Sequence, residues 1–241
     1  MQRREFLSSA LALAAASSLP VARADVIAGG QPWEPGKASL PPLPEVRQGG
    51  LAFFNQHEFE TTEAIAERLI PSDDLSIGGK DAGCATFIDR QLAGDYGKGA
   101  TLYRLGRFVK GTFEQGTQSA LTPAERWRKG LAAIDQYSQA KFAKPFVQLV
   151  GADQDQVLRS FEAGSVAVGA EFDNGAKEIF EQVLANVREG FLADPIYGGN
   201  KGMASWKMLG FPGARYDFRD VIGKKGQKLH IIPTSLIDNT L

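Results

Sequence analysis

The longest amphipathic stretch of the chain lies between Asn174 and Leu192, and it is the feature that most limits the possible folds. Apolar residues recur there at intervals of three and four, the spacing that lines one face of an α-helix. They are Ile179, Phe180, Val183, Leu184, Val187 and Phe191. Asp194-Pro195 follows and ends the helix, because proline has no backbone N–H to continue it. The stretch therefore predicts a long helix with one buried face.

Three further helices are expected from their start and stop signals. The first covers residues 55–70, where early glutamates complement the helix dipole and Pro71 ends the helix. Asp81 is expected to cap a short helix that stops at Gly94 and buries Cys84, Phe87, Ile88 and Leu92. Asp153 is expected to cap another helix, which buries Val157, Leu158 and Phe161.

The clearest helix start is Thr122-Pro123-Ala124-Glu125, which combines a capping hydroxyl, proline in the first turn and a glutamate placed for a capping box. Its helix should run to Ala143. A less regular helical stretch is expected over residues 103–113, which glycines interrupt. Before the C-terminal part, no alternation of apolar and polar residues is long enough to predict a strand. The fold class is therefore mainly α, an irregular helical bundle over residues 53–194.

The N-terminus has the three parts of a secretory signal: a basic start, an apolar stretch and a small-residue cleavage site. An arginine pair followed by phenylalanine and leucine is the pattern of the twin-arginine export route. The motif residues are Arg3, Arg4, Phe6 and Leu7, and the cleavage-site residues are Ala22 and Ala24. The apolar stretch is shorter than the roughly 20 residues of a membrane span. We therefore expect residues 1–24 to be removed after export to the periplasm.

Charge and cysteine content exclude several classes of function. Without residues 1–24 the chain has 24 basic and 27 acidic residues, which leaves no basic field for nucleic acid or an anionic membrane. The single cysteine, Cys84, rules out an internal disulfide and a self-contained zinc or iron–sulfur cage. Its position on an apolar helix face predicts a buried small side chain, with an inter-subunit disulfide or a reactive thiol as the alternative.

Residues 25–52 are rich in proline and glycine and predict an extended arm rather than a helix or strand. The segment contains three large apolar residues, Trp33, Leu40 and Leu43, which could contact another protein. Two interpretations fit: the arm lies in a groove on another protein, or it is a disordered spacer.

Residues 195–241 predict a long loop and a tail. Glycines let the loop backbone approach another surface closely, and its large aromatic rings supply contact area of the kind found at interfaces. Either the loop binds a partner protein, or it folds back over its own bundle with Trp206 inserted into the core. The candidate interface residues are Trp33, Tyr197, Gly198, Gly199, Asn200, Trp206, Phe211 and Pro212.

Several segments together resemble the gluconate 2-dehydrogenase subunit 3 family. They are the twin-arginine start, Phe53-Phe54-Asn55-Gln56-His57-Glu58, Gly83-Cys84-Ala85-Thr86-Phe87-Ile88-Asp89, Asp194-Pro195-Ile196-Tyr197-Gly198-Gly199-Asn200 and Trp206-Lys207-Met208-Leu209-Gly210-Phe211-Pro212-Gly213. The aromatic and glycine-rich block at the end is the most specific part. The resemblance covers most of the chain after the signal.

This resemblance implies a small, or gamma, subunit of a membrane-bound dehydrogenase complex in the periplasm. In such complexes a large subunit holds FAD, in several cases with an iron–sulfur cluster, and a multihaem cytochrome c subunit passes electrons on. The small subunit holds no cofactor. It is needed for maturation of the large subunit and supplies the twin-arginine signal, so that the two cross the membrane as a folded pair.

Two other functions are compatible with the sequence. The first is a stand-alone periplasmic binding module that uses the loop from Tyr197 to Phe211 as a ligand pocket. The second is a hydrolase whose catalytic residues meet only in the folded chain, with His57 beside Asp73 or Asp74 as the first group to test. No nucleophile elbow, phosphate-binding loop or zinc-protease helix is present in the sequence.

Overall fold

The computed structural model describes residues 50–100, 119–215 and 217–236, together with residues 102, 106, 109, 111, 112 and 115. Within this part of the chain there are seven α-helices and no strand, so the predicted mainly α fold is confirmed. The α-helices are α2 (Gln56–Leu69), α3 (Cys84–Ala93), α4 (Asp95–Lys98), α5 (Pro123–Phe142), α6 (Gly151–Glu162), α7 (Ala176–Leu192) and α8 (Ala204–Leu209). Single 3-10 turns are η2 (Phe146–Gln148), η3 (Pro195–Tyr197), η4 (Lys201–Met203) and η5 (Arg219–Val221).

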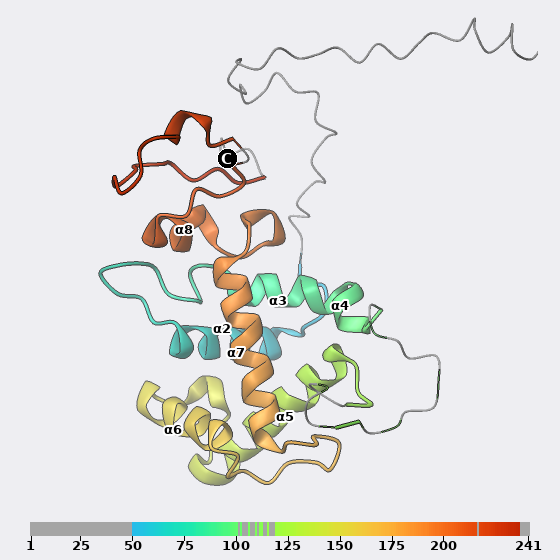
Figure 1. Cartoon of the computed structure of the whole chain (residues 1–241). Helices are drawn as coiled ribbons and strands as arrows, with labels where there is room; N and C mark the ends of the chain where they lie inside the picture. Colours follow the sequence, from blue (N-terminus) through green and yellow to red (C-terminus); the bar gives the residue numbers. More distant parts are fainter. Residues whose placement is uncertain are drawn as a thin grey trace, which may run out of the picture. The chain divides into compact units, whose positions relative to one another are not determined.

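Helix α7 runs through the middle of the bundle and contacts α2, α3, α5 and α6 (Figure 1). The predicted apolar face is the buried one: Ile179, Val183, Val187 and Phe191 lie in the core. They pack with Trp127 of α5, Phe161 of α6 and the apolar residues of α3. All described residues belong to one compact unit. Among them, no helix combines the length and the hydropathy that a membrane crossing requires.

The helix starts confirm some predicted caps and correct others. Asn55 with Glu58 closes a capping box on α2, and Thr122 with Glu125 closes the predicted one on α5. The predicted caps at Asp81 and Asp153 are wrong.

Backbone geometry explains both corrections. Helix α3 begins after Gly83, whose φ of +79° turns the chain into the helix without a side-chain cap. Helix α6 begins at Gly151, so Asp153 lies in its first turn, where the helix dipole favours a carboxylate. The helical stretch expected over residues 103–113 falls largely outside the described residues.

A buried carboxylate fixes the start of the described chain. Asp89 of α3 accepts hydrogen bonds from the backbone N–H groups of Ala52, Phe53 and Phe54, at 2.7, 2.9 and 2.8 Å. Phe54 then packs edge-on against Trp127 of α5. Because a buried carboxylate needs such partners, the residues before α2 are held against both α3 and α5.

An ion pair between α2 and α6 gives the bundle a pH dependence. Arg68 donates two hydrogen bonds to Asp155, at 2.7 and 2.8 Å, and these lower the pKa of Asp155 from its ordinary value. Because this pKa is lower in the folded chain, the pair stabilises the fold above the ordinary carboxyl pKa. The stabilisation is lost as the pH falls through the folded-state pKa.

We expect Asp155→Asn to lower the free energy of unfolding at neutral pH by about 1 kcal/mol, because the pair is only partly buried. At a pH well below the lowered pKa of Asp155, the difference between the variant and the wild type should vanish, because both side chains are then uncharged. Urea unfolding at the two pH values measures this. Arg68→Gln should lower the free energy of unfolding by a similar amount. Combining it with Asp155→Asn should lower that free energy little further, because the pair is already broken. A difference that persists in acid would contradict the assignment.

Candidate functional site

The aromatic and glycine-rich residues identified in the sequence form the first part of residues 195–236, called here the C-terminal segment. It follows α7 directly and contains η3, η4, α8 and η5. Some of its residues are packed into the bundle, and others are exposed to solvent.

Asp194 fixes both ends of the C-terminal segment. Its carboxylate accepts the backbone N–H of Ile196 at 2.9 Å, which caps η3. The same carboxylate accepts the Ser235 hydroxyl at 2.7 Å and the Leu236 backbone N–H at 2.9 Å. Asp194 therefore ties the last described residues to the end of α7.

Asn200 is fully buried and turns the chain between η3 and α8. Its backbone is left-handed, with φ of 45°, a conformation that asparagine tolerates better than most residues. Its side-chain amide donates to the Ala193 carbonyl at 2.9 Å. Its side-chain oxygen accepts the Ser205 backbone N–H and the Ser205 hydroxyl. The role of Asn200 is thus to shape the loop from inside.

Trp206 is inserted beneath the loop and is only 6% exposed. Its indole N–H donates to the Leu192 carbonyl at 2.8 Å, which satisfies a backbone group at the end of α7. Phe211 packs edge-on against the indole but remains 46% exposed, and Tyr197 is 50% exposed. Trp206 therefore packs as the self-folded interpretation predicts, whereas Tyr197 and Phe211 are available for contact with a partner.

Glycines allow the segment to lie directly on the bundle. A Cβ on Gly199 would overlap the carbonyl oxygen of Gly190 in α7. A Cβ on Gly83, before α3, would lie 2.9 Å from the Gly198 carbonyl oxygen. Between these two approaches, the Lys201 backbone N–H donates to the Ala82 carbonyl at 3.1 Å. The segment is docked on the start of α3 and the end of α7 by backbone contact.

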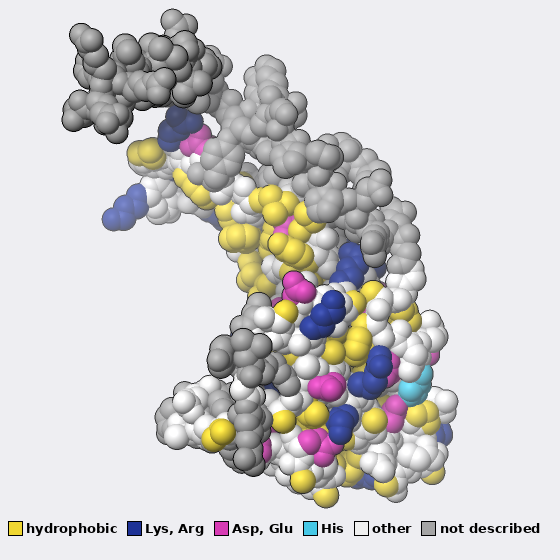
Figure 2. All heavy atoms as spheres, turned by 90° about the vertical axis from the view of Figure 1, so that its right-hand side faces the viewer, with side chains coloured by type: hydrophobic (Ala, Val, Ile, Leu, Met, Phe, Trp, Pro, Cys, Tyr) yellow, Lys and Arg dark blue, Asp and Glu magenta, His cyan; other side chains and the backbone are white. Residues whose placement is uncertain are grey.

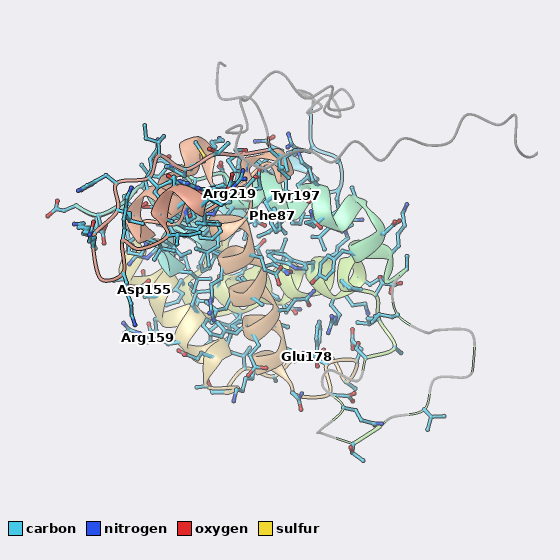
Figure 3. The ribbon with its side chains drawn as sticks, turned by 45° about the horizontal axis from the view of Figure 1, so that its top comes forward. Phe87, Asp155, Arg159, Glu178, Tyr197 and Arg219 are labelled. Carbon is cyan, nitrogen blue, oxygen red and sulfur yellow. The ribbon has the colours of Figure 1, made fainter. Side chains whose placement is uncertain are left out.

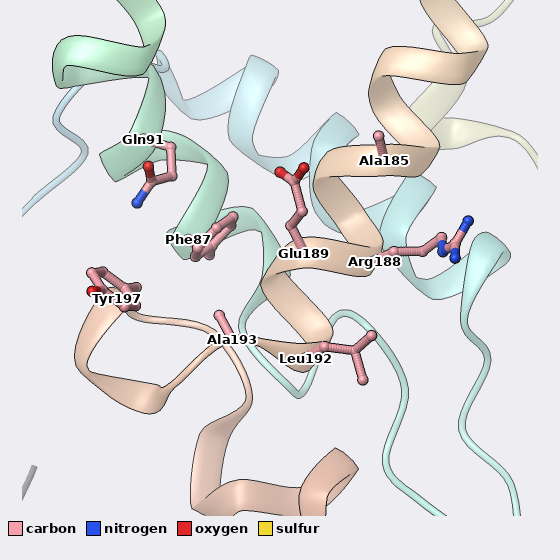
Figure 4. Close-up of a pocket in the computed structure, with 8 residues that line it drawn as sticks. All are labelled: Phe87, Gln91, Ala185, Arg188, Glu189, Leu192, Ala193 and Tyr197. Carbon is pink, nitrogen blue, oxygen red and sulfur yellow. The ribbon is translucent and has the colours of Figure 1, made fainter. Parts of the chain in front are cut away.

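A groove of about 790 Å³ lies where η3 meets α3 and α7 (Figure 4). Its lining residues are Phe87, Gln91, Ala185, Arg188, Glu189, Leu192, Ala193 and Tyr197. Figure 4 shows the side chains of Phe87, from α3, and Tyr197, from η3, next to each other at the groove. Glu189 is held by the side chain of Asn186, which itself accepts the indole N–H of Trp127. The groove thus has a mostly apolar floor with a fixed carboxylate on one wall.

His57 and Asp73, two of the residues proposed for hydrolysis, have other partners. His57 contacts Asp135 of α5 at 2.5 Å, and Asp135 also accepts the Phe146 backbone N–H. Asp73 instead accepts the backbone N–H groups of Leu75 and Ser76 in its own loop. No group of histidine, cysteine or carboxylate side chains that could hold a metal ion is found among the described residues.

Cys84 is fully buried at the start of α3, and burial raises its pKa to about 12. A thiol in this position is almost entirely protonated at neutral pH and is inaccessible to a partner. The interpretation of Cys84 as a small core side chain is the one that its burial supports.

A family model described as gluconate 2-dehydrogenase subunit 3 matches residues 56–213, well over half of the chain. The chain belongs to the gluconate 2-dehydrogenase subunit 3 family. No curated protein and no solved structure matches it. The family match extends from the first residue of α2 to Gly213, so it includes the whole bundle and the docked aromatic loop.

Some predicted positions of this family member lie outside the described residues: the export motif Arg3, Arg4, Phe6 and Leu7, the cleavage site Ala22 and Ala24, and Trp33 of the arm. The interface assignment of the other residues stays a prediction. Sequence reasoning missed Asp194 and Ser235 as the residues that close the segment. The only signal was the helix-ending Asp194-Pro195, which indicates a local cap but no distant partner.

We expect Gly199→Ala to destabilise the fold by about 1–3 kcal/mol, because the new methyl group has no space beside the Gly190 carbonyl. Gly106→Ala is the matched control, since nothing lies within 4 Å of a Cβ at that position. It should change stability by less than about 0.5 kcal/mol. Thermal unfolding followed by circular dichroism measures both. Equal stability of the two variants would show that the segment is not docked by this contact.

Proposed function

We propose that this chain is the non-catalytic small subunit of a gluconate 2-dehydrogenase-type complex in the periplasm, needed for maturation and twin-arginine export of the FAD-bearing large subunit. Membership of the subunit 3 family over residues 56–213 is the observation that carries the proposal. The arginine pair Arg3-Arg4 with Phe6 and Leu7 supports the export part. In this proposal the flavin, any iron–sulfur cluster and haem c are held by the partner subunits.

The arrangement of the C-terminal segment supports a binding role rather than chemistry on this chain. Its backbone is fixed by Asp194, Asn200 and the contact of Gly199 with α7. On that fixed backbone, Tyr197 and Phe211 present half-exposed rings. Rigid loops with exposed aromatic side chains are typical of surfaces that bind other proteins.

Expression of the large subunit with and without this chain tests the maturation role. With the chain present, we expect soluble large subunit with bound flavin and dehydrogenase activity. Without it, we expect the flavin content and the activity of the recovered large subunit to fall at least about tenfold, as an incompletely folded state predicts. Flavin absorbance and activity per mole of large subunit are the measurements. Equal folding and activity in both cases would refute the maturation role.

The export role predicts that Arg3→Lys together with Arg4→Lys retains the large subunit in the cytoplasm. The route reads the arginine pair through a receptor, so a loss of the pair on this chain should affect both proteins if they travel together. Immunodetection of the large subunit in periplasmic and cytoplasmic fractions measures the effect. Normal amounts of periplasmic large subunit in this double variant would contradict joint export, while leaving the maturation role intact.

A further inference from the structure

The C-terminal segment carries an unneutralised set of lysines. Residues 195–236 contain seven basic and two acidic residues. Both acidic residues are already paired within the segment, Asp217 with Arg219 at 2.6 Å and Asp220 with Arg215. The remaining charge is that of five exposed lysines: Lys201, Lys207, Lys224, Lys225 and Lys228. Four of them, all except Lys224, form no ion pair or electrostatic contact with a described acidic residue.

The rest of the body has the opposite charge. Residues 50–194 contain 15 basic and 21 acidic residues, a formal charge of −6, against +5 for the C-terminal segment. Charges of both signs are normally interspersed on the surface of a small domain. A separation of this size instead creates a positive potential over one segment, and such a potential attracts a negatively charged surface.

Exposed apolar side chains accompany the lysines. Leu209, Ile222 and Ile232 are 61%, 78% and 84% exposed, and Phe211 and Phe218 are both about half exposed. Figure 2 shows hydrophobic side chains gathered over the part of the molecule that holds α8 and the C-terminal segment. Apolar side chains that lie together on a surface mark a contact site, because their burial is favourable by about 25 cal/mol per Å².

We propose that the C-terminal segment is the surface that binds the FAD-bearing large subunit, and that the matching surface of the large subunit is acidic around an apolar centre. This inference rests on the proposed function, which supplies the partner. The five lysines would form the charged rim, and Leu209, Phe211, Ile222 and Ile232 the apolar centre. This arrangement matches the general anatomy of protein interfaces, in which an apolar core lies within a polar rim.

The observations favour a protein over a lipid surface as the occupant. Helices that lie in a membrane interface bury one continuous apolar face, whereas the longest helix in the segment, α8, has only six residues. The segment is mostly irregular backbone held in place by Asp194 and Asn200, which suits a shaped protein surface.

The test uses the full mature chain and the purified large subunit, with the dissociation constant measured by biolayer interferometry at low and high salt. One variant reverses three lysines: Lys224→Glu, Lys225→Glu and Lys228→Glu. Its matched control reverses three exposed lysines of the bundle: Lys141→Glu, Lys144→Glu and Lys177→Glu. Figure 3 shows Glu178, the neighbour of Lys177, at the opposite end of α7 from Tyr197. Circular dichroism checks that all variants are folded.

A second variant pair tests the apolar centre. Leu209→Ser, Ile222→Ser and Ile232→Ser remove exposed apolar side chains from the segment. Leu75→Ser with Val150→Ser does the same on the bundle, where both residues are strongly exposed. Exposed positions of this kind contribute little to folding, so these changes should leave stability within about 0.5 kcal/mol of the wild type.

We expect the segment lysine variant to weaken binding at least about tenfold at low salt and less at high salt, because salt screens rim charges. The segment serine variant should weaken binding by a similar factor at both salt concentrations. Both controls should bind within about twofold of the wild type.

The possible failures are distinguishable. Wild-type chain that does not bind the large subunit would refute the proposed function itself. If the wild-type chain binds, but the segment variants have the same dissociation constants as their controls, the surface assignment alone is overturned. Sedimentation with vesicles of phosphatidylglycerol and phosphatidylethanolamine tests whether the segment binds a membrane instead. If the wild type binds vesicles and the segment variants do not, but those variants still bind the large subunit, the assignment is overturned in favour of a membrane surface.

Discussion

The close backbone approach at Gly190 is the constraint on which the rest of the structure depends. On one side of α7, a Cβ at this position would lie 3.0 Å from the Phe87 ring and 3.2 Å from the Cα of Cys84 in α3. On the other side, the Gly190 carbonyl lies directly beneath Gly199. Three parts of the chain thus meet at Gly190, which has no side chain to hold them apart. Because α3 and α7 are this close, the C-terminal segment can span both and satisfy the backbone groups at their ends.

The bundle was predictable where a local pattern determines the outcome. The periodicity over residues 174–192 identified α7 and its buried face, and the Thr122 capping box identified the start of α5. The caps proposed at Asp81 and Asp153 failed because a capping residue needs suitable φ and ψ angles as well as a suitable side chain. Those angles depend on how the preceding loop packs, as at Gly83. Local sequence carries little information about that packing.

The candidate site was located by sequence, but its division into buried and exposed residues was not. Trp206 and Phe211 are large aromatic residues five positions apart, and the sequence does not distinguish their environments. Trp206 is buried, whereas Phe211 is about half exposed. The sequence also shows the charged residues of the segment, but it does not show that the acidic residues pair with the arginines and leave most of the lysines without a described acidic partner. The bond between Asp194 and Ser235 joins residues 41 positions apart, and only the tertiary structure brings them together.

That bond has a consequence for the residues between its ends. Thr234 pairs with Gly213 in a parallel bridge, and the Ala214 backbone N–H donates to the Thr234 carbonyl at 2.7 Å. Residues 214–233 therefore form a closed loop whose ends are pinned beside α7. The entropy of closing such a loop is lost when the chain folds, not when the loop meets another molecule. A pre-organised loop of this kind gives up less freedom on association, so more of its contact energy remains as affinity.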